Sequence, residues 1–109
     1  MMLVVVEPWQ GFGADVNKRL FRGYAATAAV REGYLEILEV LLKAGLSQPA
    51  CDEALLEASY VGRARHAELL MGSNMISLQV AVHALVTACC RGFLDVVSLL
   101  IKVMLAFFI

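Results

Sequence analysis

The stretch that decides the fold is GYLEILEVLLKAG, at residues 33–45. Its apolar residues recur at i, i+1, i+4 and i+5, which lays one wide apolar stripe along a helix. These stripe residues are Ile37, Leu38, Leu41 and Leu42. Gly45 follows the last periodic residue, where a left-handed cap favours a residue without Cβ. The stretch therefore predicts a short amphipathic helix that ends at a glycine.

The same template recurs twice downstream. GFLDVVSLLIK at residues 92–102 is a close copy, and GRARHAELLM at residues 62–71 is a weaker one. Their stripe residues are Val96, Val97, Leu100 and Ile101 in the close copy, and His66, Ala67, Leu70 and Met71 in the weaker one. Because a helix of about ten residues is marginal alone in water, each copy must bury its stripe on a neighbour. Repetition of this kind predicts an all-α solenoid of stacked helix-turn-helix repeats that serves as a binding scaffold.

A shorter alanine-rich helix precedes each copy, over approximately residues 24–32, 53–61 and 83–91. Counted back from the closing glycines Gly33, Gly62 and Gly92, small or apolar residues recur at fixed positions. They are Ala29, Ala58 and Ala88 four residues before, Ala26, Leu55 and Leu85 seven before, and Ala25, Ala54 and Ala84 eight before. Small residues let paired helices approach closely, and the glycine permits a sharp reversal between them. We predict turns in the connecting segments 45–52 and 72–82, which carry Gly, Ser, Pro or Asn.

With GADVN at residues 13–17 ahead of it, the first helix pair resembles the ankyrin repeat, whose usual period is 33 residues. The likeness is carried by G-x-L-E-x-x-x-x-L-L-x-x-G at residues 33–45 and extends over about residues 13–102. The family's T-P-L-H opening is altered in all three units, which read Tyr24-Ala-Ala-Thr27, Glu53-Ala-Leu-Leu56 and His83-Ala-Leu-Val86. The resemblance implies three degenerate units, at approximately 13–45, 46–73 and 74–102, in a fragment of a longer array.

Composition bounds the class of protein. The chain is 61% hydrophobic, with a mean hydropathy of +0.74, above the level of ordinary soluble domains. Some apolar surface is therefore expected to stay exposed, as in a fragment or a chain covered by a partner. The net charge of −1 gives no general attraction to nucleic acid or to an acidic membrane. An odd number of cysteines without framework spacing suits a reducing compartment, so we expect an intracellular protein, cytoplasmic or nuclear.

The two ends of the chain differ from the repeats. Residues 1–12 read as a leader, either an edge strand or a poorly ordered segment, because an apolar β-branched run ends there at Glu7-Pro8. Residues 103–109 form a hydrophobic tail, where the last unit of an array should present a polar face. Three explanations compete: a cut from a longer array, which we favour, a partner docked on the tail, or a membrane. A span is not predicted, because the apolar run covers residues 96–109 with Lys102 inside it and a bilayer needs about 20 residues.

The cysteines and histidines are weak candidates for chemistry. Cys89 occupies a position that is expected to be buried and Cys90 one that is expected to be exposed, so we predict a core and a surface cysteine rather than a redox pair. Cys51, His66 and His83 lack the spacing of zinc ligands, and no metal site is predicted. His66 reads as a tolerated polar substitution on the apolar stripe, which weakens its unit by about 1 kcal/mol or more if it is buried without a partner.

The charged groups also have structural explanations. Two basic groups lack the interleaved aromatic residues of a single-strand groove, so no nucleic-acid site is predicted. They are Lys18, Arg19 and Arg22, and Arg63, Arg65 and His66. Three carboxylates, of Asp52, Glu53 and Glu57, are explained by the dipole at a helix start. We expect no catalytic residue, no cofactor and no small-molecule substrate. An enzyme that uses Cys90 is the remotest alternative.

The resemblance implies that protein partners bind at the helix-pair tips and on the inner surface of the short helices. The corresponding positions are the two residues before each closing glycine and the loops that precede the short helices. The candidate partner-binding residues are Phe21, Arg31, Glu32, Asp52, Tyr60, Val61, Gln79, Cys90 and Arg91. Alternatively, Phe21 and Tyr60 pack between repeats. The sequence therefore predicts a non-enzymatic protein-protein interaction scaffold, with a membrane-associated protein held by its C-terminal tail as the alternative.

Overall fold

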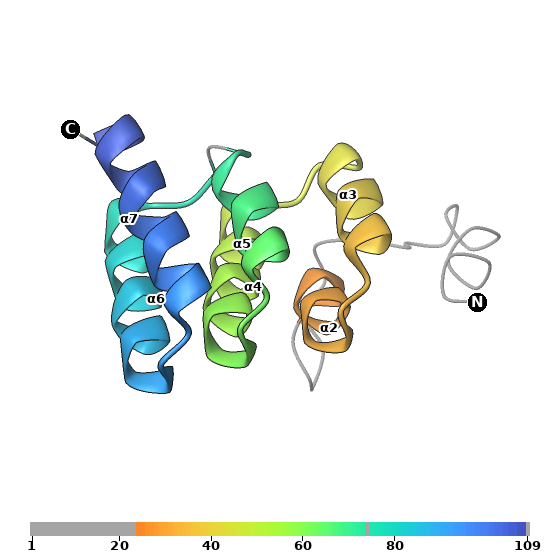
Figure 1. The fold of residues 1–109 in the computed structure, drawn as a ribbon. Coiled ribbons are helices and arrows are strands. Elements are labelled where there is room, and N and C mark those ends of the chain that lie inside the picture. The colour runs from red at the N-terminus through yellow and green to blue at the C-terminus, as the bar shows by residue number, and fades with distance from the viewer. Residues whose placement is uncertain (1–23, 74, 109) are drawn as a thin grey trace, which may run out of the picture.

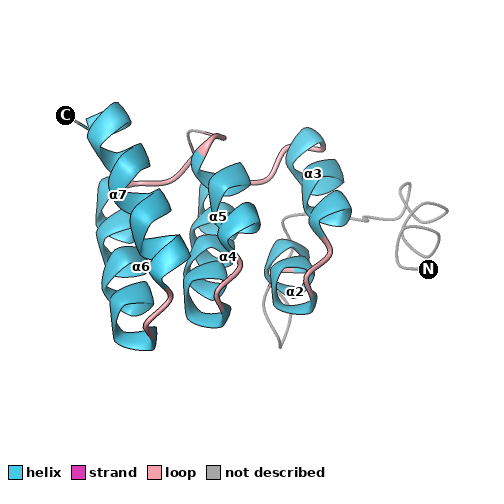
Figure 2. Ribbon diagram, in the orientation of Figure 1, coloured by secondary structure: helices cyan, strands magenta, loops and turns pink. Residues whose placement is uncertain are grey.

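The computed structural model describes residues 24–73 and 75–108, and every regular element within them is an α-helix (Figure 1) (Figure 2). The helices are α2 (Ala25–Glu32), α3 (Leu35–Lys43), α4 (Gln48–Val61), α5 (Ala64–Met71), α6 (Leu78–Arg91) and α7 (Leu94–Phe108). The predicted all-α class is confirmed. The predicted leader at residues 1–12 lies outside the described residues, whereas residues 103–108 of the predicted tail prolong α7.

The helices form three antiparallel pairs, α2 with α3, α4 with α5 and α6 with α7, packed side by side (Figure 1). α4 lies between α2 and α6 in one layer and contacts both. α5 lies between α3 and α7 in the other layer and contacts both. The middle pair is therefore covered on both sides, while the pair of α6 and α7 has a neighbour on one side among the described residues.

The three glycines that close the first helix of each pair lie in equivalent surroundings. Gly33, Gly62 and Gly92 have φ values of 84°, 83° and 76°. Each donates its N–H to the alanine carbonyl four residues earlier, and the residue after it donates to the same carbonyl. The accepting residues are Ala29, Ala58 and Ala88. This left-handed ending produces the sharp reversal that the sequence predicted at these glycines. The left-handed residue predicted at Gly45 is also present, with a φ of 97°.

α4 and α6 begin five residues earlier than predicted, at Gln48 and Leu78. The predicted turns over 48–52 and 78–82 are therefore wrong. Proline is compatible with the first turn of a helix, since its missing N–H would have no intrahelical partner there, and Pro49 occupies such a position. Ser77 is the N-cap of α6, and its Oγ accepts the Val80 N–H at 3.3 Å.

The core is built from small side chains between the first helices and leucines between the layers. The predicted alanine register is confirmed at Ala29, Ala54, Ala58, Ala84 and Ala88, all buried, whereas Ala25 is exposed. Four leucines have no exposed surface: Leu38, Leu55, Leu70 and Leu100. Because alanine side chains are small, the axes of α2, α4 and α6 approach closely and these helices pack directly against one another.

Two residues predicted to be buried are exposed. Cys89 stands at the position of Val30 and Ser59, which are fully buried, yet it lies on the surface. Ile101 belongs to the predicted apolar stripe, and its equivalent Met71 is 4% exposed, but Ile101 is 44% exposed. The reason is the same for both: the next helix pair covers these positions in the first two pairs, and no described helix covers them in the third.

Candidate protein-binding edge

The C-terminal ends of α2, α4 and α6 lie along one edge of the molecule, at the bottom of Figure 1. We call this the helix-end edge and define it by six residues: Arg31, Glu32, Tyr60, Val61, Cys90 and Arg91. All six were predicted from the sequence as partner-binding residues. The structure brings them together because the three helices are parallel and end at equivalent glycines.

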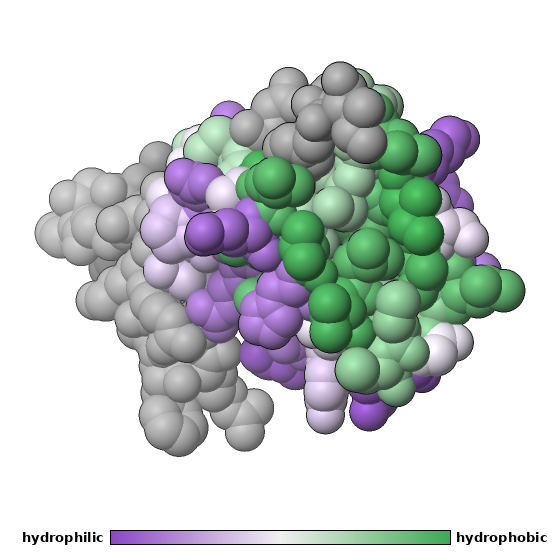
Figure 3. Space-filling model, turned by 90° about the vertical axis from the view of Figure 1, so that its left-hand side faces the viewer, coloured by the Kyte–Doolittle hydropathy of each residue, from purple (hydrophilic) through white to green (hydrophobic). Residues whose placement is uncertain are grey.

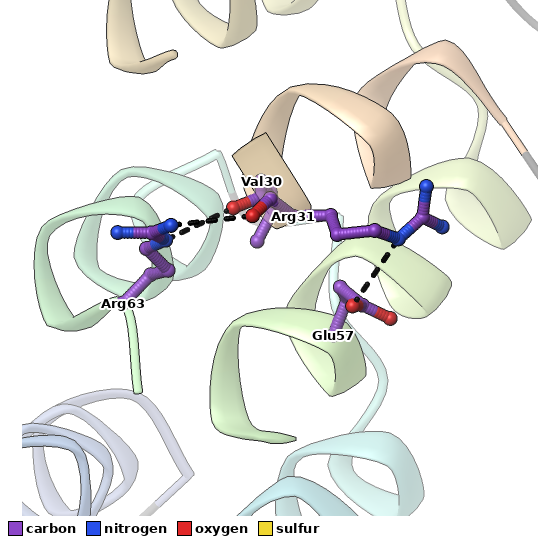
Figure 4. Close-up of polar contacts among 4 residues, drawn as sticks. All are labelled: Val30, Arg31, Glu57 and Arg63. Atoms are coloured by element: carbon purple, nitrogen blue, oxygen red, sulfur yellow. Dashed lines mark hydrogen bonds and ion pairs between the residues drawn. The ribbon is translucent and has the colours of Figure 1, made fainter. Parts of the chain in front are cut away.

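Arg63, in the second helix pair, donates hydrogen bonds to the C-terminal end of α2 (Figure 4). Its Nε donates to the Val30 carbonyl at 3.2 Å, and its Nη2 donates to the Arg31 carbonyl at 3.2 Å. The last carbonyls of a helix lack donors from within the helix, and an arginine from the neighbouring pair donates to two of them here. The Val30 carbonyl also accepts the Gly33 N–H. The Arg31 side chain points the other way and lies 3.5 Å from a Glu57 carboxylate oxygen. That ion pair is partly exposed and adds little to stability.

Arg91, in the third helix pair, makes a similar hydrogen bond to the C-terminal end of α4. Its Nε donates to the Tyr60 carbonyl at 3.0 Å. Its guanidinium carbon lies 4.4 Å from the centre of the Tyr60 ring and 5.7 Å from that of Phe93. Both distances are within the range of a cation–π contact. Tyr60 remains 53% exposed, so the two side chains together offer an aromatic group and a cation at the surface.

The two arginines occupy different sequence positions, because Arg63 follows its closing glycine and Arg91 precedes its own. Both nevertheless reach the carbonyl of the residue two places before the glycine of the preceding pair. Sequence reasoning placed Arg91 at the partner surface and took Arg63 only as part of a basic group. Neither contact could be read from spacing, since each joins residues more than 30 positions apart.

Three predicted site residues do not join the helix-end edge. Phe21 lies outside the described residues. Asp52 and Gln79 were predicted to lie in loops, but they belong to α4 and α6, in the N-terminal part of each helix. The predicted loop placement is wrong for the same reason as the predicted turns: both helices start early, at Gln48 and Leu78. Gln79 is exposed on the first turn of α6.

Asp52 is half-buried where α4 faces the start of α6. Burial raises the pKa of its carboxyl above the ordinary 3.8, and a hydrogen bond with the Ser77 backbone opposes that rise. Its Oδ1 is buried without a hydrogen-bond partner. Burial, followed by the Asp52 charge, raises the pKa of the neighbouring Cys51 thiol. Asp52 therefore lies where α4 meets the start of α6, away from the helix-end edge.

His66 is buried in α5, as predicted, and its Nε2 has no hydrogen-bond partner. Burial, followed by the nearby Arg63 charge, lowers the pKa of His66 below its ordinary 6.5. Within residues 24–73 and 75–108, no three His, Cys, Asp or Glu side chains gather as a metal site would need. Cys89 and Cys90 are both exposed free thiols, so the predicted division into a core and a surface cysteine is wrong.

A concave region lies between α3 and α5. It is an open groove of about 550 Å³ with apolar and charged walls. Its lining residues are Leu35, Glu39, Leu42, Lys43, Arg65, Glu68, Leu69, Gly72 and Ser73. The two cationic and two anionic side chains offset one another, and the groove belongs to the second-helix layer, apart from the helix-end edge.

None of the helices in the described part of the chain combines the length and the apolar character that crossing a bilayer requires. Comparison of the chain with models of protein families, with curated proteins and with solved structures finds no match.

Proposed function

We propose that the chain is a non-enzymatic protein-binding scaffold of the ankyrin-repeat type, a solenoid of three helix pairs that acts inside the cell. Its partner, another protein, would bind along the helix-end edge. The observation that carries the proposal is the alignment of three equivalent helix ends, each closed by a left-handed glycine. Such an alignment repeats pairs of variable side chains at regular intervals on one side of a rigid support.

The chemistry of the helix-end edge supports a protein ligand. Binding hot spots are enriched in tyrosine, tryptophan and arginine. Tyr60 and Arg91 supply two of these types in contact with each other, with the guanidinium 4.4 Å from the ring centre. Arg31 and Glu32 add one charge of each sign one helix away. A surface with a stacked aromatic side chain and charges of both signs suits a protein partner.

The support beneath these side chains is held in place by the neighbouring pair. Arg63 and Arg91 each bond a backbone carbonyl at a preceding helix end. The spacing of α2, α4 and α6 at the helix-end edge is therefore set by hydrogen bonds as well as by alanine packing. A pre-organised surface loses less conformational entropy when it binds.

The test is capture of partners by the immobilised full chain from cell extract, followed by titration of the captured protein. Replacing Tyr60 and Arg91 together by alanine should weaken binding about 10-fold or more, because both anchors are removed. The control replaces Val40 and Lys43, an exposed apolar and an exposed cationic residue of α3, by alanine. Equal binding by both double variants, with helix content unchanged by circular dichroism, would assign the partner surface elsewhere.

A further inference from the structure

Arg63 and Arg91 differ in how much of the guanidinium the fold uses. Arg63 donates from Nε and Nη2 to two carbonyls, and its guanidinium lies 3.0–3.1 Å from where a Cβ on Gly33 would stand. Arg91 is exposed and donates from Nε alone, to the Tyr60 carbonyl. Neither Nη of Arg91 has a hydrogen-bond partner among the described residues. We call these two nitrogens the Nη edge of Arg91, and it is open to a group from outside the chain.

The Nη edge is left open because of one change in the repeat register. The residue after the closing glycine is Arg63 in the second pair and Phe93 in the third. The Phe93 ring packs on Gly62, where it takes the place that a guanidinium takes in the preceding pair. The arginine of the third pair therefore reaches the helix end from the position before its glycine. There its guanidinium stacks 4.4 Å from the centre of the Tyr60 ring, with its Nη edge at the surface.

The chain supplies no carboxylate to this cation. At the first helix end, Arg31 lies 3.5 Å from a Glu57 carboxylate oxygen. Arg91, in contrast, forms no ion pair with any residue that the structure describes. Its positive charge is therefore fixed in position by the Tyr60 carbonyl and ring, and is not neutralised by the described part of the chain.

The side of the molecule next to Arg91 carries few charges. Figure 3 views the molecule from the third helix pair and shows a broad hydrophobic area over α6 and α7. At neutral pH the charged residues of these two helices are Arg91, Asp95 and Lys102. Asp95 lies in the first turn of α7, where the helix dipole favours an acid, and Lys102 lies in the middle of that helix. Arg91 is thus the charged residue of this pair that belongs to the helix-end edge, where charge can select a partner.

We propose that an aspartate or glutamate side chain of the protein partner binds the Nη edge of Arg91, beside the Tyr60 ring. This inference rests on the proposed function and specifies the partner's chemistry. A guanidinium offers paired N–H donors that match the two oxygens of a carboxylate, and stacking on a ring leaves those donors free. The Nε bond and the ring hold the guanidinium in place before binding, which lowers the entropy lost on association. Phosphopeptide sites use clusters of arginines, and the other arginine of the helix-end edge, Arg31, already faces Glu57.

The experiment selects binders from a random peptide library displayed on phage, with the immobilised full chain as bait. We expect the enriched peptides to share one Asp or Glu. The dissociation constant of the best peptide, measured by fluorescence anisotropy, should rise about 10-fold when that acid is changed to its amide. Arg91→Gln should cause a similar loss with the acidic peptide and little further loss with the amide peptide. Arg91→Lys keeps the charge without the paired donors and should lie between. The matched control is Lys102→Gln on α7, which should bind like the unmodified chain.

The other outcomes separate this inference from the proposed function. Peptides that need Tyr60 but carry no acid, or that bind Arg91→Gln equally well, would overturn the carboxylate and leave the helix-end edge as the partner surface. Peptides that bind the Tyr60→Ala/Arg91→Ala variant unchanged would overturn both. A phosphoserine that binds more tightly than the acid it replaces would assign the Nη edge to phosphopeptides instead, and a failure to enrich any peptide would also count against the carboxylate. If circular dichroism shows that Arg91→Gln is unfolded, the acid-to-amide change in the peptide decides on the unmodified chain.

Discussion

The turn between α4 and α5 allows a sharp test of how the helix pairs pack. Gly62 has a φ of 83°, and a Cβ added to it would lie 2.9–3.0 Å from three carbons of the Phe93 ring. Gly92 has a φ of 76° and closes α6 in the same way, but a Cβ added there meets nothing within 4 Å. Replacing each glycine by alanine therefore separates backbone strain from the clash with the next helix pair.

The expected magnitudes follow from these two surroundings. An L-residue in the left-handed region costs about 1–2 kcal/mol, which is the whole effect expected for Gly92→Ala. Gly62→Ala carries the same strain, and overpacking against the Phe93 ring adds about 1–3 kcal/mol. Phe93→Ala removes the ring, so on that background Gly62→Ala should cost no more than Gly92→Ala. The Gly62–Phe93 coupling energy should therefore equal the overpacking term.

Urea unfolding followed by circular dichroism at 222 nm measures all four variants and the unmodified chain. The slopes should agree among them, so that shifts in the midpoint report changes in the free energy of unfolding. Equal losses for Gly62→Ala and Gly92→Ala, or a Gly62–Phe93 coupling near zero, would refute the packing of the Phe93 ring on the α4–α5 turn.

Three further predictions concern single side chains, and urea midpoints measure each. Burial lowers the pKa of His66, so the unfolded chain binds a proton more readily than the folded chain, and stability should fall as the pH drops below 6.5. His66→Val should remove this pH dependence and raise the free energy of unfolding by about 1 kcal/mol at pH 7.5. A pH profile that the substitution leaves unchanged would contradict this. Arg63→Met removes two hydrogen bonds to helix-end carbonyls and should lower the free energy of unfolding by about 1.5–3 kcal/mol. Arg65 is exposed, so the control Arg65→Met should lower it by less than about 0.5 kcal/mol. Similar losses in the two variants would show that the two bonds do not stabilise the fold. Leu41→Ala removes a residue that is 8% exposed and should cost about 2–5 kcal/mol; an unchanged midpoint would mean that the stripe of α3 is not buried.

Local sequence was sufficient for the secondary structure. The apolar spacing around Leu38 and Leu41 predicted α3, and the glycine at residue 33 predicted where α2 ends. Alanines at fixed distances from the glycines predicted the contact surfaces of α2, α4 and α6. These features are readable because a helix stripe, a left-handed cap and a close helix approach each depend on residues within a few positions of one another.

The starts of α4 and α6 were also locally encoded but were misread. Ser47 with Pro49, and Ser77, are helix-start signals, and the prediction took their serines, proline and neighbouring residues as turns. The consequence was the misplacement of Asp52 and Gln79, which sequence reasoning put in partner-facing loops. Serine at the N-cap and proline in the first turn both favour a helix start, so these residues place Asp52 and Gln79 inside helices.

The sequence by itself determined that six short helices form within residues 24–73 and 75–108, and which side of most of them is apolar. Only the tertiary structure decided which apolar positions are covered and which polar groups meet. Cys89 and Val30 have the same register, and one is exposed while the other is buried, because burial depends on whether another helix pair lies alongside. The contact of Arg91 with Tyr60 likewise exists because packing brings the ends of α4 and α6 together, and no periodicity in the chain encodes that distance.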